Sequence, residues 1–249
     1  MPRDKENSLI LEEIIKIYSE VKGIYGYRRV TLNINKRLRS NYNHKRIYRL
    51  MKSINLTSVI RKKRKKYMYC PPQVTAENVL NRDFTADKPN EKWLTDVTEF
   101  KLTTGKKVYL SAILDLNDNV IVSYVVGTSN NNNLVFDTLD QAIIANPTAK
   151  PIFHSDRGFQ YTSKLFKQKL DKIKATQSMS RVGRCIDNGP MEGFWGTLKS
   201  EMYNLRKFET IEELRQAIDA YIEFYNTKRL QRKLKGMTPI EYRNHTLSI

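Results

Sequence analysis

Apolar residues in the N-terminal part of the chain recur every three or four positions, which is the spacing of one helix face. Glycines and the polar run Asn41–Asn43 interrupt the pattern, and Asn43 suits the N-cap of a helix. The pattern predicts three short helices, at residues 8–22, 27–38 and 44–53. The third helix has a basic side opposite its apolar side. This is typical of a helix-turn-helix-like unit, and a small helical bundle with a solvated charged face is the alternative.

From Trp93 onward the pattern changes to short apolar runs rich in β-branched residues. Three such runs, separated by turn-forming residues, predict an antiparallel meander at residues 93–102, 107–116 and 120–127. Helical and extended patterns then alternate, which predicts a helix at 131–145, a strand at 151–155, a helix at 163–173 and a strand at 175–179. The fold class that follows is α/β, with a mixed five-stranded sheet flanked by helices on both faces.

The C-terminal part returns to helical spacing after the polar stretch Ser180–Gly189, which we expect to be a mobile loop. Pro190 suits the first turn of a helix, and Thr210 with Glu213 has the spacing of a capping box. The pattern predicts two helices and the start of a last short one, at residues 189–202, at 210–225 and from 238.

The positive charge of the chain is concentrated near its N-terminus. The net charge is +18, and residues 1–72 hold 19 Lys and Arg against 5 Asp and Glu, while the rest of the chain holds 25 against 21. Six consecutive cations, Arg61–Lys66, would repel one another unless a polyanion neutralised them. The clustering favours a nucleic-acid partner over a protein that is merely basic.

Other features exclude whole classes of protein. No apolar run approaches the length of a membrane span and the N-terminus lacks the apolar core of a signal peptide, so we expect a soluble cytoplasmic protein. Cys70 and Cys185 do not combine with the three histidines at a spacing typical of zinc sites, so a structural zinc ion is not expected. An intracellular setting favours free thiols over a disulfide.

Three carboxylates stand where they could meet. Asp96 lies inside a predicted strand, Asp156 directly follows another, and Glu192 follows Asp156 with 35 residues between them, at the start of a predicted helix. A carboxylate inside a strand is costly unless it is paired, and carboxylate oxygens are the ligands that Mg²⁺ or Mn²⁺ prefers. Two such ions could clamp one phosphodiester between the attacking and the leaving oxygen. The alternative is that these are ordinary acids, as most acids of the chain would be.

The sequence leaves the roles of several residues near the three acids undecided. We interpret Asp115 and Asp118, near a predicted turn, as bystanders of the site. His154 precedes Asp156 by two residues, and it could orient the site or a phosphate, or be a packed core histidine. Lys199, seven residues after Glu192, falls on the same helix face and is a candidate phosphate contact. The candidate DNA-binding residues are Arg28, Arg29, Lys45, Arg46, Arg49, Arg61, Lys62, Lys63, Arg64, Lys65, Lys66, Arg157, Lys199, Lys228 and Arg229.

Several motifs, in order along nearly the whole chain, resemble those of the insertion-sequence transposases of the IS-three family, in their second-reading-frame, catalytic form. They are Tyr25-Gly26-Tyr27-Arg28-Arg29, Trp93-Leu94-Thr95-Asp96-Val97-Thr98, His154-Ser155-Asp156-Arg157-Gly158 with Gln160-Tyr161, Asp187-Asn188 with Glu192, Phe194 and Leu198-Lys199, and Tyr225-Asn226 with Arg229 ahead of Thr238-Pro239. The resemblance implies a ribonuclease H-like core shared with retroviral integrases. It also implies that Asp96, Asp156 and Glu192 form the catalytic, metal-binding triad.

The resemblance further implies a function. The expected enzyme is a DNA transposase that cuts an element end, exposes a 3′-OH and uses that hydroxyl to attack a second phosphodiester, with two Mg²⁺ or Mn²⁺ ions. Its partners would be double-stranded DNA at the element ends and at the target, further copies of the chain on DNA, and an upstream helix-turn-helix reading frame, fused or separate. A circular intermediate, nucleoid association in a bacterial cytoplasm and no membrane partner are part of the expectation, as is ordering of the Ser180–Gly189 loop only when DNA and metal bind.

With the family in view, the predicted domains are a DNA-binding-like helical region at 1–56, a basic linker at 57–90, a ribonuclease H-like integrase core at 91–204 and a helical extension at 205–249. Two alternatives stay open: a ribonuclease H-like nuclease that cuts without joining, and a noncatalytic DNA-binding regulator of the element. Tyrosine recombination is disfavoured, because no matching Arg, His and Tyr constellation is found. The absence of a His and Cys zinc-domain motif favours a transposase over a retroviral integrase.

Overall fold

The computed structural model describes residues 2–60, 77–181 and 185–248. Contacts between residues divide the chain into two compact units. We call them the helical unit, Met1–Lys65 with Arg229–Thr238, and the sheet unit, Lys66–Lys228 with Pro239–Ile249. The predicted basic arm, Arg61–Lys66, lies outside the described residues, as do Cys70 and the side chain of Cys185.

The helical unit confirms the three predicted N-terminal helices, which are α1 (Pro2–Glu20), α2 (Tyr27–Arg37) and α3 (His44–Ser53). Their apolar faces are buried together, with Ile14, Val30 and Ile47 fully inaccessible. The Asn43 side chain accepts a hydrogen bond from the Lys45 backbone N–H, so it caps α3 as predicted. The first helix begins at Pro2 rather than at residue 8. The sequence pattern does not indicate its first turns, because they are polar and have no apolar periodicity.

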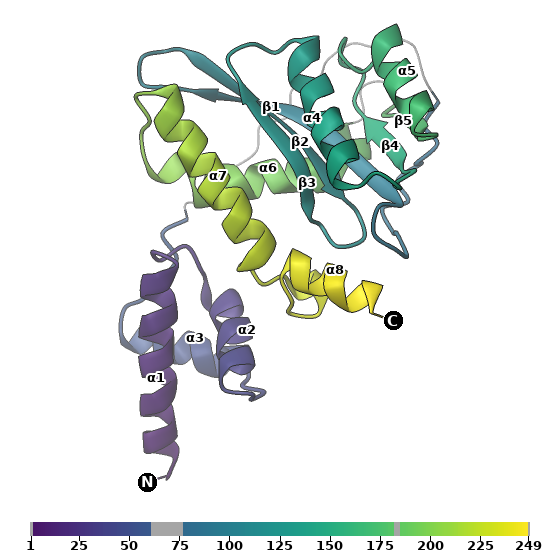
Figure 1. The fold of residues 1–249 in the computed structure, drawn as a ribbon. Coiled ribbons are helices and arrows are strands. Elements are labelled where there is room, and N and C mark those ends of the chain that lie inside the picture. The colour runs from purple at the N-terminus through teal and green to yellow at the C-terminus, as the bar shows by residue number, and fades with distance from the viewer. Residues whose placement is uncertain (1, 61–76, 182–184, 249) are drawn as a thin grey trace. The chain divides into compact units, whose positions relative to one another are not determined.

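The sheet unit contains the predicted mixed sheet, whose strand order is β3-β2-β1-β4-β5. The strands are β1 (Lys92–Lys101), β2 (Lys107–Asp115), β3 (Ile121–Gly127), β4 (Ile152–Ser155) and β5 (Thr176–Met179). The first three strands form the antiparallel meander, and β4 and β5 are added in parallel to the edge that β1 provides. The long strand β1 is therefore central, with an antiparallel neighbour on one side and a parallel neighbour on the other (Figure 1).

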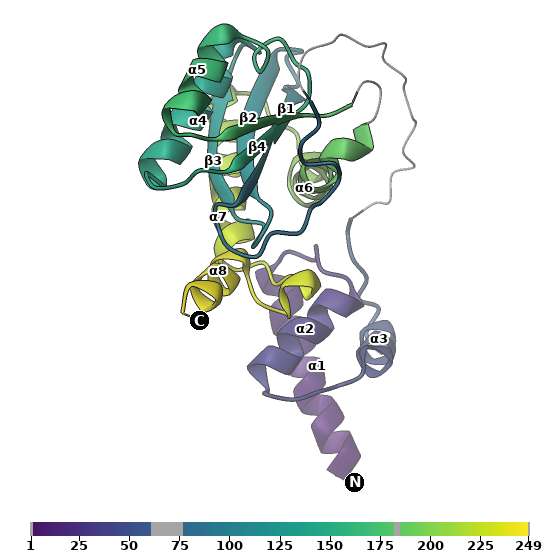
Figure 2. The same cartoon turned by 90° about the vertical axis from the view of Figure 1, so that its right-hand side faces the viewer.

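Helices cover both faces of the sheet (Figures 1 and 2). On one face α4 (Asn132–Ala145) and α5 (Lys164–Lys172) form a core with Trp93 and Phe153. On the other face α6 (Gly189–Glu201) and α7 (Ile211–Thr227) pack against Leu94 and its neighbours. Successive residues of a strand point to opposite faces, so Trp93 and Leu94 supply the two cores in turn.

Short helices complete the chain. They are η1 (Cys185–Asn188), η2 (Tyr203–Leu205), η3 (Arg232–Leu234) and the C-terminal α8 (Pro239–Leu247). The capping box predicted at Thr210 and Glu213 is present at the start of α7. Within the described ranges, no helix combines the length and the apolar character needed to cross a membrane.

Candidate active site

The register of the central strands places two of the three candidate acids side by side. Strands β1 and β4 run parallel, and Leu94 pairs with His154 at the end of their ladder. Asp96 is two residues beyond Leu94, and Asp156 is two residues beyond His154. The two acids therefore have the same offset from the last register pair, with Asp96 inside β1 and Asp156 just after the end of β4, and neighbouring strands lie about 4.8 Å apart.

Asp96 is a half-buried carboxylate whose two oxygens already accept hydrogen bonds. Oδ1 accepts from the Val97 backbone N–H at 2.8 Å, and Oδ2 accepts from the Trp195 indole Nε1–H of α6 at 3.0 Å. Burial raises the pKa of Asp96 to about 7, with the charge of Asp156 as the next cause and that of Glu192 as a smaller one. The strand carboxylate is thus paired, but like charges nearby still disfavour its ionised form.

Asp156 lies directly after β4 with an exposed side chain, and its Oδ1 accepts from the Gly158 backbone N–H at 2.9 Å. Partial burial by the surrounding protein raises its pKa, and the Gly158 hydrogen bond opposes that rise. A Cβ on Gly158 would lie 3.1 Å from this Oδ1 and 2.8 Å from Oε1 of Gln160. Glycine therefore allows the turn to close tightly around the carboxylate.

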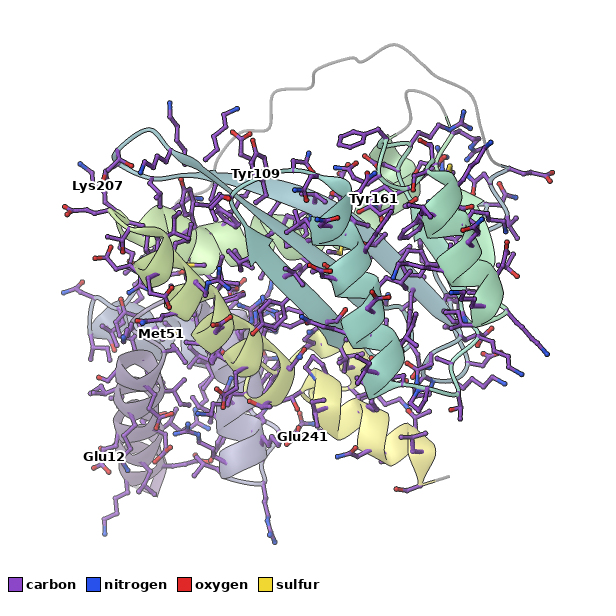
Figure 3. The ribbon with its side chains drawn as sticks, turned by 45° about the horizontal axis from the view of Figure 1, so that its top comes forward. Glu12, Met51, Tyr109, Tyr161, Lys207 and Glu241 are labelled. Carbon is purple, nitrogen blue, oxygen red and sulfur yellow. The ribbon has the colours of Figure 1, made fainter. Side chains whose placement is uncertain are left out.

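Tyr161, labelled in Figure 3, interacts electrostatically with both acids. The side chain is fully buried, and its hydroxyl is 3.4 Å from Oγ1 of Thr95. Burial, followed by the charges of Asp96 and Asp156, holds the pKa of Tyr161 well above its usual value. Tyr161 is therefore a neutral hydroxyl at the base of the site.

His154 faces the interior. Its ring is inaccessible, with Nδ1 at 2.9 Å from Oγ of Ser178 and Nε2 at 3.1 Å from Oγ of Ser180. Burial lowers its pKa to about 4, so the imidazole is neutral near pH 7. Of the two roles that the sequence left open, this geometry matches the packed core histidine.

Glu192 lies in the first turn of α6 and is half-buried. Its charge contributes to the raised pKa of Asp96, so the three acids share one electrostatic environment. In the described part of the chain, however, no group of three His, Cys, Asp or Glu side chains is arranged to hold a metal ion. The donor chemistry of Asp96, Asp156 and Glu192 nevertheless fits a hard divalent cation.

Two residues of the segment before α6, Asp187 and Asn188, bind to other parts of the sheet unit. Asn188 is buried and donates from Nδ2 to the Thr95 backbone carbonyl at 3.1 Å, while its Oδ1 has no hydrogen-bond partner. Asp187 is fully buried and accepts from Arg181 Nε at 3.0 Å and from Arg82 Nε at 2.6 Å. Burial favours the neutral acid, but these hydrogen bonds outweigh it and hold the pKa of Asp187 well below its usual range.

These attachments bear on the expectation of a mobile loop at Ser180–Gly189. Arg181 on one side and the 3₁₀ helix η1 on the other are tied together through Asp187. Residues 182–184 lie outside the described part of the chain. Ordering on DNA and metal binding stays a prediction.

The candidate DNA-binding residues have different surroundings. In the helical unit Arg28, Lys45 and Arg49 are exposed, whereas Arg46 donates to Glu6 at 2.7 Å and also to Asn7. Arg29 is half-buried and Arg229 is buried there, and in the sheet unit Lys228 is exposed. Arg157 donates from Nε to the Ser180 carbonyl at 2.7 Å, and the Lys199 ammonium lies 5.2 Å from the ring centre of Phe100.

Sequence reasoning missed two of the residues that shape the site. Trp195 is three residues after Glu192, so helix geometry puts both on one face, and this spacing could have indicated that Trp195 reaches Asp96. Asp187 belongs to the family-like motif Asp187-Asn188, but no sequence pattern identifies its partners Arg82 and Arg181. The bystanders Asp115 and Asp118 are not surface acids either, because both are fully buried against Arg243 of α8.

The strand order, the helices on both faces and the two acids, Asp96 within β1 and Asp156 just after β4, are typical of an integrase-type core. Two family models, both described as integrase core domain, match residues 86–185 and 192–247. A third, described as HTH-like domain, matches residues 4–64.

Curated relatives identify the family. The chain is 47% identical over 238 residues to the putative transposase InsK of insertion sequence element IS150 from Escherichia coli, covering 95% of this chain and 83% of that protein. It is 34% identical over 244 residues to the transposase of insertion sequence element IS904 from Lactococcus lactis, covering 96% and 95%. The chain belongs to the insertion-sequence transposases of the IS-three family, which have a retroviral-integrase-like core.

Solved structures support the fold. The catalytic core domain of an HTLV-2 integrase, in complex with magnesium, matches with a TM-score of 0.51 and 19% identity, covering 63% of this chain and 97% of that one. A chain of a simian T-cell lymphotropic virus intasome matches with a TM-score of 0.55 and 15% identity, covering 92% and 74%. At these identities the likeness extends to the fold alone, and it confirms the predicted ribonuclease H-like class.

Proposed function

We propose that the protein cuts DNA at the ends of an insertion sequence and joins the exposed 3′-OH to a second phosphodiester. Membership of the transposase family supports a polynucleotidyl transferase. The observation that carries the proposal further is the placement of Asp96 on β1 and of Asp156 directly after the neighbouring parallel strand β4, each two residues beyond the pair Leu94 and His154. Burial, followed by the charge of Asp156, raises the pKa of Asp96 to about 7, and a divalent cation bound there would favour the ionised carboxylates.

The residues that would hold metal are Asp96, Asp156 and Glu192. Two Mg²⁺ or Mn²⁺ ions bound there would supply activation of the attacking oxygen and neutralisation of charge on the leaving oxygen. For this the three carboxylates must converge on the ions, since the described residues form no group of three that is arranged to hold a metal. The start of α6, which carries Glu192, rests on the Asn188 hydrogen bond to β1, and we propose that this contact rearranges when DNA and metal bind.

The surrounding residues then have defined tasks. Trp195 holds one oxygen of Asp96 in a fixed direction, and the Gly158 N–H does the same for Asp156. The buried Tyr161 stays protonated, and the neutral His154 supports the strand end through Ser178 and Ser180. We propose that DNA reaches both carboxylates from the side that these contacts do not occupy.

The proposed partners are double-stranded DNA at the element ends and at the target. The match to the HTH-like domain and the net charge of +18 support a DNA partner. An assembly of several copies on DNA is proposed because one of the structural relatives is a chain of an intasome. Joint action with an upstream reading frame, and a place at the nucleoid in the bacterial cytoplasm, complete the proposal.

A strand-transfer assay tests the activity. An end duplex with a labelled 3′-OH is incubated with the protein, target plasmid and Mg²⁺, and a joined product is expected. Hydrolysis with no joined product would indicate a nuclease instead. Binding of end DNA with neither reaction would indicate a noncatalytic regulator.

Trp195→Phe is expected to lower the strand-transfer rate about tenfold, because the variant loses the hydrogen bond that orients Asp96, and such a bond to a charged group contributes about 1.5–3 kcal/mol. The concentration of Mg²⁺ needed for half-maximal rate should rise, while DNA affinity should not change. The rate is measured across a Mg²⁺ titration.

Trp93→Phe is the matched control. Trp93 is also buried, and its indole donates to Asn90 at 3.2 Å rather than to a site acid. It should lose comparable stability while keeping the Mg²⁺ dependence of the wild type. Equal shifts of the Mg²⁺ midpoint in both variants would refute the positioning role of Trp195.

A further inference from the structure

A cavity of about 670 Å³ lies within the helical unit, lined by two stretches far apart in sequence. One stretch is formed by α2, the turn before α3 and the first residue of α3. The other is the short segment Arg229–Lys233, from the part of the chain that follows α7. The charged lining residues are Arg28, Arg29, Arg229, Arg232 and Lys233.

The C-terminal wall of the cavity has its own fixed geometry. Gln231 and Met237 form an antiparallel bridge, and the Gln231 N–H donates to the Met237 carbonyl at 3.0 Å. Gly236 closes the turn at a φ of 81°, which glycine adopts without strain. Leu234 is buried, so Arg232 and Lys233 on the same short helix are left with exposed side chains.

The opposite wall is also held in place. The Asn35 side chain donates from Nδ2 to the Tyr42 carbonyl at 3.2 Å and accepts from the Tyr42 N–H at 2.8 Å. These two bonds fix the turn that leads into α3, and Asn43 caps the helix from there. The cavity is therefore formed before any ligand arrives, so binding would need little ordering of the protein.

The chemistry of the lining selects an anion. Five of its residues are cations, contributed by both walls, and no Asp or Glu is among the lining residues. Asn41 and Asn43 add polar side chains, and the start of α3 directs the positive end of a helix dipole toward this region. Arginine suits such a site, because its planar guanidinium can donate two parallel hydrogen bonds to a phosphate.

We propose that this cavity binds a backbone phosphodiester of DNA, and that Arg229–Lys233 is therefore part of the DNA-binding surface of the helical unit. The inference rests on the proposed function insofar as it takes DNA as the partner. Beyond that function, we infer that the C-terminal segment supplies phosphate contacts in addition to those of the N-terminal helices. Arg232 and Lys233 contact the phosphate, and the buried Arg229 supports the wall behind them.

The test compares two single substitutions in the full chain. Arg232→Gln removes one positive charge from the cavity, and Lys235→Asn removes one from an exposed position three residues away that does not line it. Lys235 has a φ of 55°, which asparagine tolerates. DNA binding is measured by fluorescence anisotropy with a labelled duplex at several salt concentrations, and unfolding curves check that both variants fold.

Arg232→Gln is expected to weaken binding about tenfold and to lower the salt-dependence slope by about 1, since one phosphate contact is lost. Lys235→Asn should change affinity less than about twofold. Equal effects of the two substitutions, or no effect of Arg232→Gln, would overturn the cavity assignment while leaving the proposed function intact. If the wild-type protein binds no DNA, the proposed function itself fails.

A competition arm separates DNA from free phosphate as the source of the anion. Inorganic phosphate is added to the wild-type complex and compared with chloride at the same ionic strength. Equal displacement of DNA by the two salts is expected. Much stronger displacement by phosphate, lost in Arg232→Gln, would mean that the cavity is a site for the free ion and would overturn the proposal.

Discussion

Asp156→Asn will abolish end cleavage and strand transfer, with a loss of at least about a thousandfold, while DNA binding persists. The substitution removes a metal-binding charge at the end of β4 but keeps the shape of the side chain. It also removes the like charge that raises the pKa of Asp96, so folding should not suffer. Rates are measured with labelled end DNA in Mg²⁺, and affinity by anisotropy.

Asp171→Asn is the matched control for this substitution. Asp171 is an exposed acid on α5 that pairs with Lys167 at 2.9 Å, so its change to asparagine alters the net charge equally. Its strand-transfer rate should stay within about twofold of the wild type, as for a surface substitution. Unchanged activity of Asp156→Asn in Mg²⁺ would contradict the catalytic assignment.

Arg243→Met will lower the free energy of unfolding of the sheet unit by about 3–5 kcal/mol. The Arg243 guanidinium donates to Asp115 at 2.8 Å and to Asp118 at 2.6 Å, and both carboxylates are inaccessible to solvent. Without the arginine, two buried like charges remain unpaired. Both tryptophans lie in the sheet unit, so guanidinium unfolding followed by their fluorescence measures the loss.

The destabilisation should depend on pH. Burial, followed by the charge of Asp118, already raises the pKa of Asp115 to about 6 in the presence of Arg243. An acid whose pKa is raised on folding binds more protons in the native state, so its contribution to stability falls as pH rises from about 4 toward its folded value. The loss in Arg243→Met should thus be larger at pH 7 than at pH 4.

Arg215→Met is the control for Arg243→Met. Arg215 lies on α7 and is half-exposed, and its distance to Glu212 is 3.8 Å. An exposed pair of this kind contributes less than about 1 kcal/mol. Equal losses of unfolding free energy in the two variants would show that the buried ion pairs of Arg243 stabilise the sheet unit no more than an exposed pair does.

The strands and the acids of the site were accessible to sequence reasoning. The meander has strong period-2 and β-branched runs bounded by turn residues, and the structure reproduces β1 to within a residue of the predicted 93–102. Asp96 and Asp156 could be chosen because each interrupts or ends an apolar run. Their pairing at equivalent positions on parallel strands needed the register, which no local pattern records.

Long-range contacts account for what the sequence did not indicate. Arg243 and Asp118 are 125 residues apart, and Trp195 reaches Asp96 across 99 residues. Neither pair has a spacing that a helix or strand pattern can reveal. For the same reason the segment Arg229–Thr238 could be read as part of a C-terminal extension, although its contacts belong to the helical unit. The predicted domain boundaries remain predictions.

A structure of the protein with end DNA and Mn²⁺ would show whether the three acids bind the metal, because anomalous scattering locates the ions. Two Mn²⁺ peaks bound by Asp96, Asp156 and Glu192 are expected. Mn²⁺ bound elsewhere, in a crystal whose DNA has been cut, would contradict this assignment.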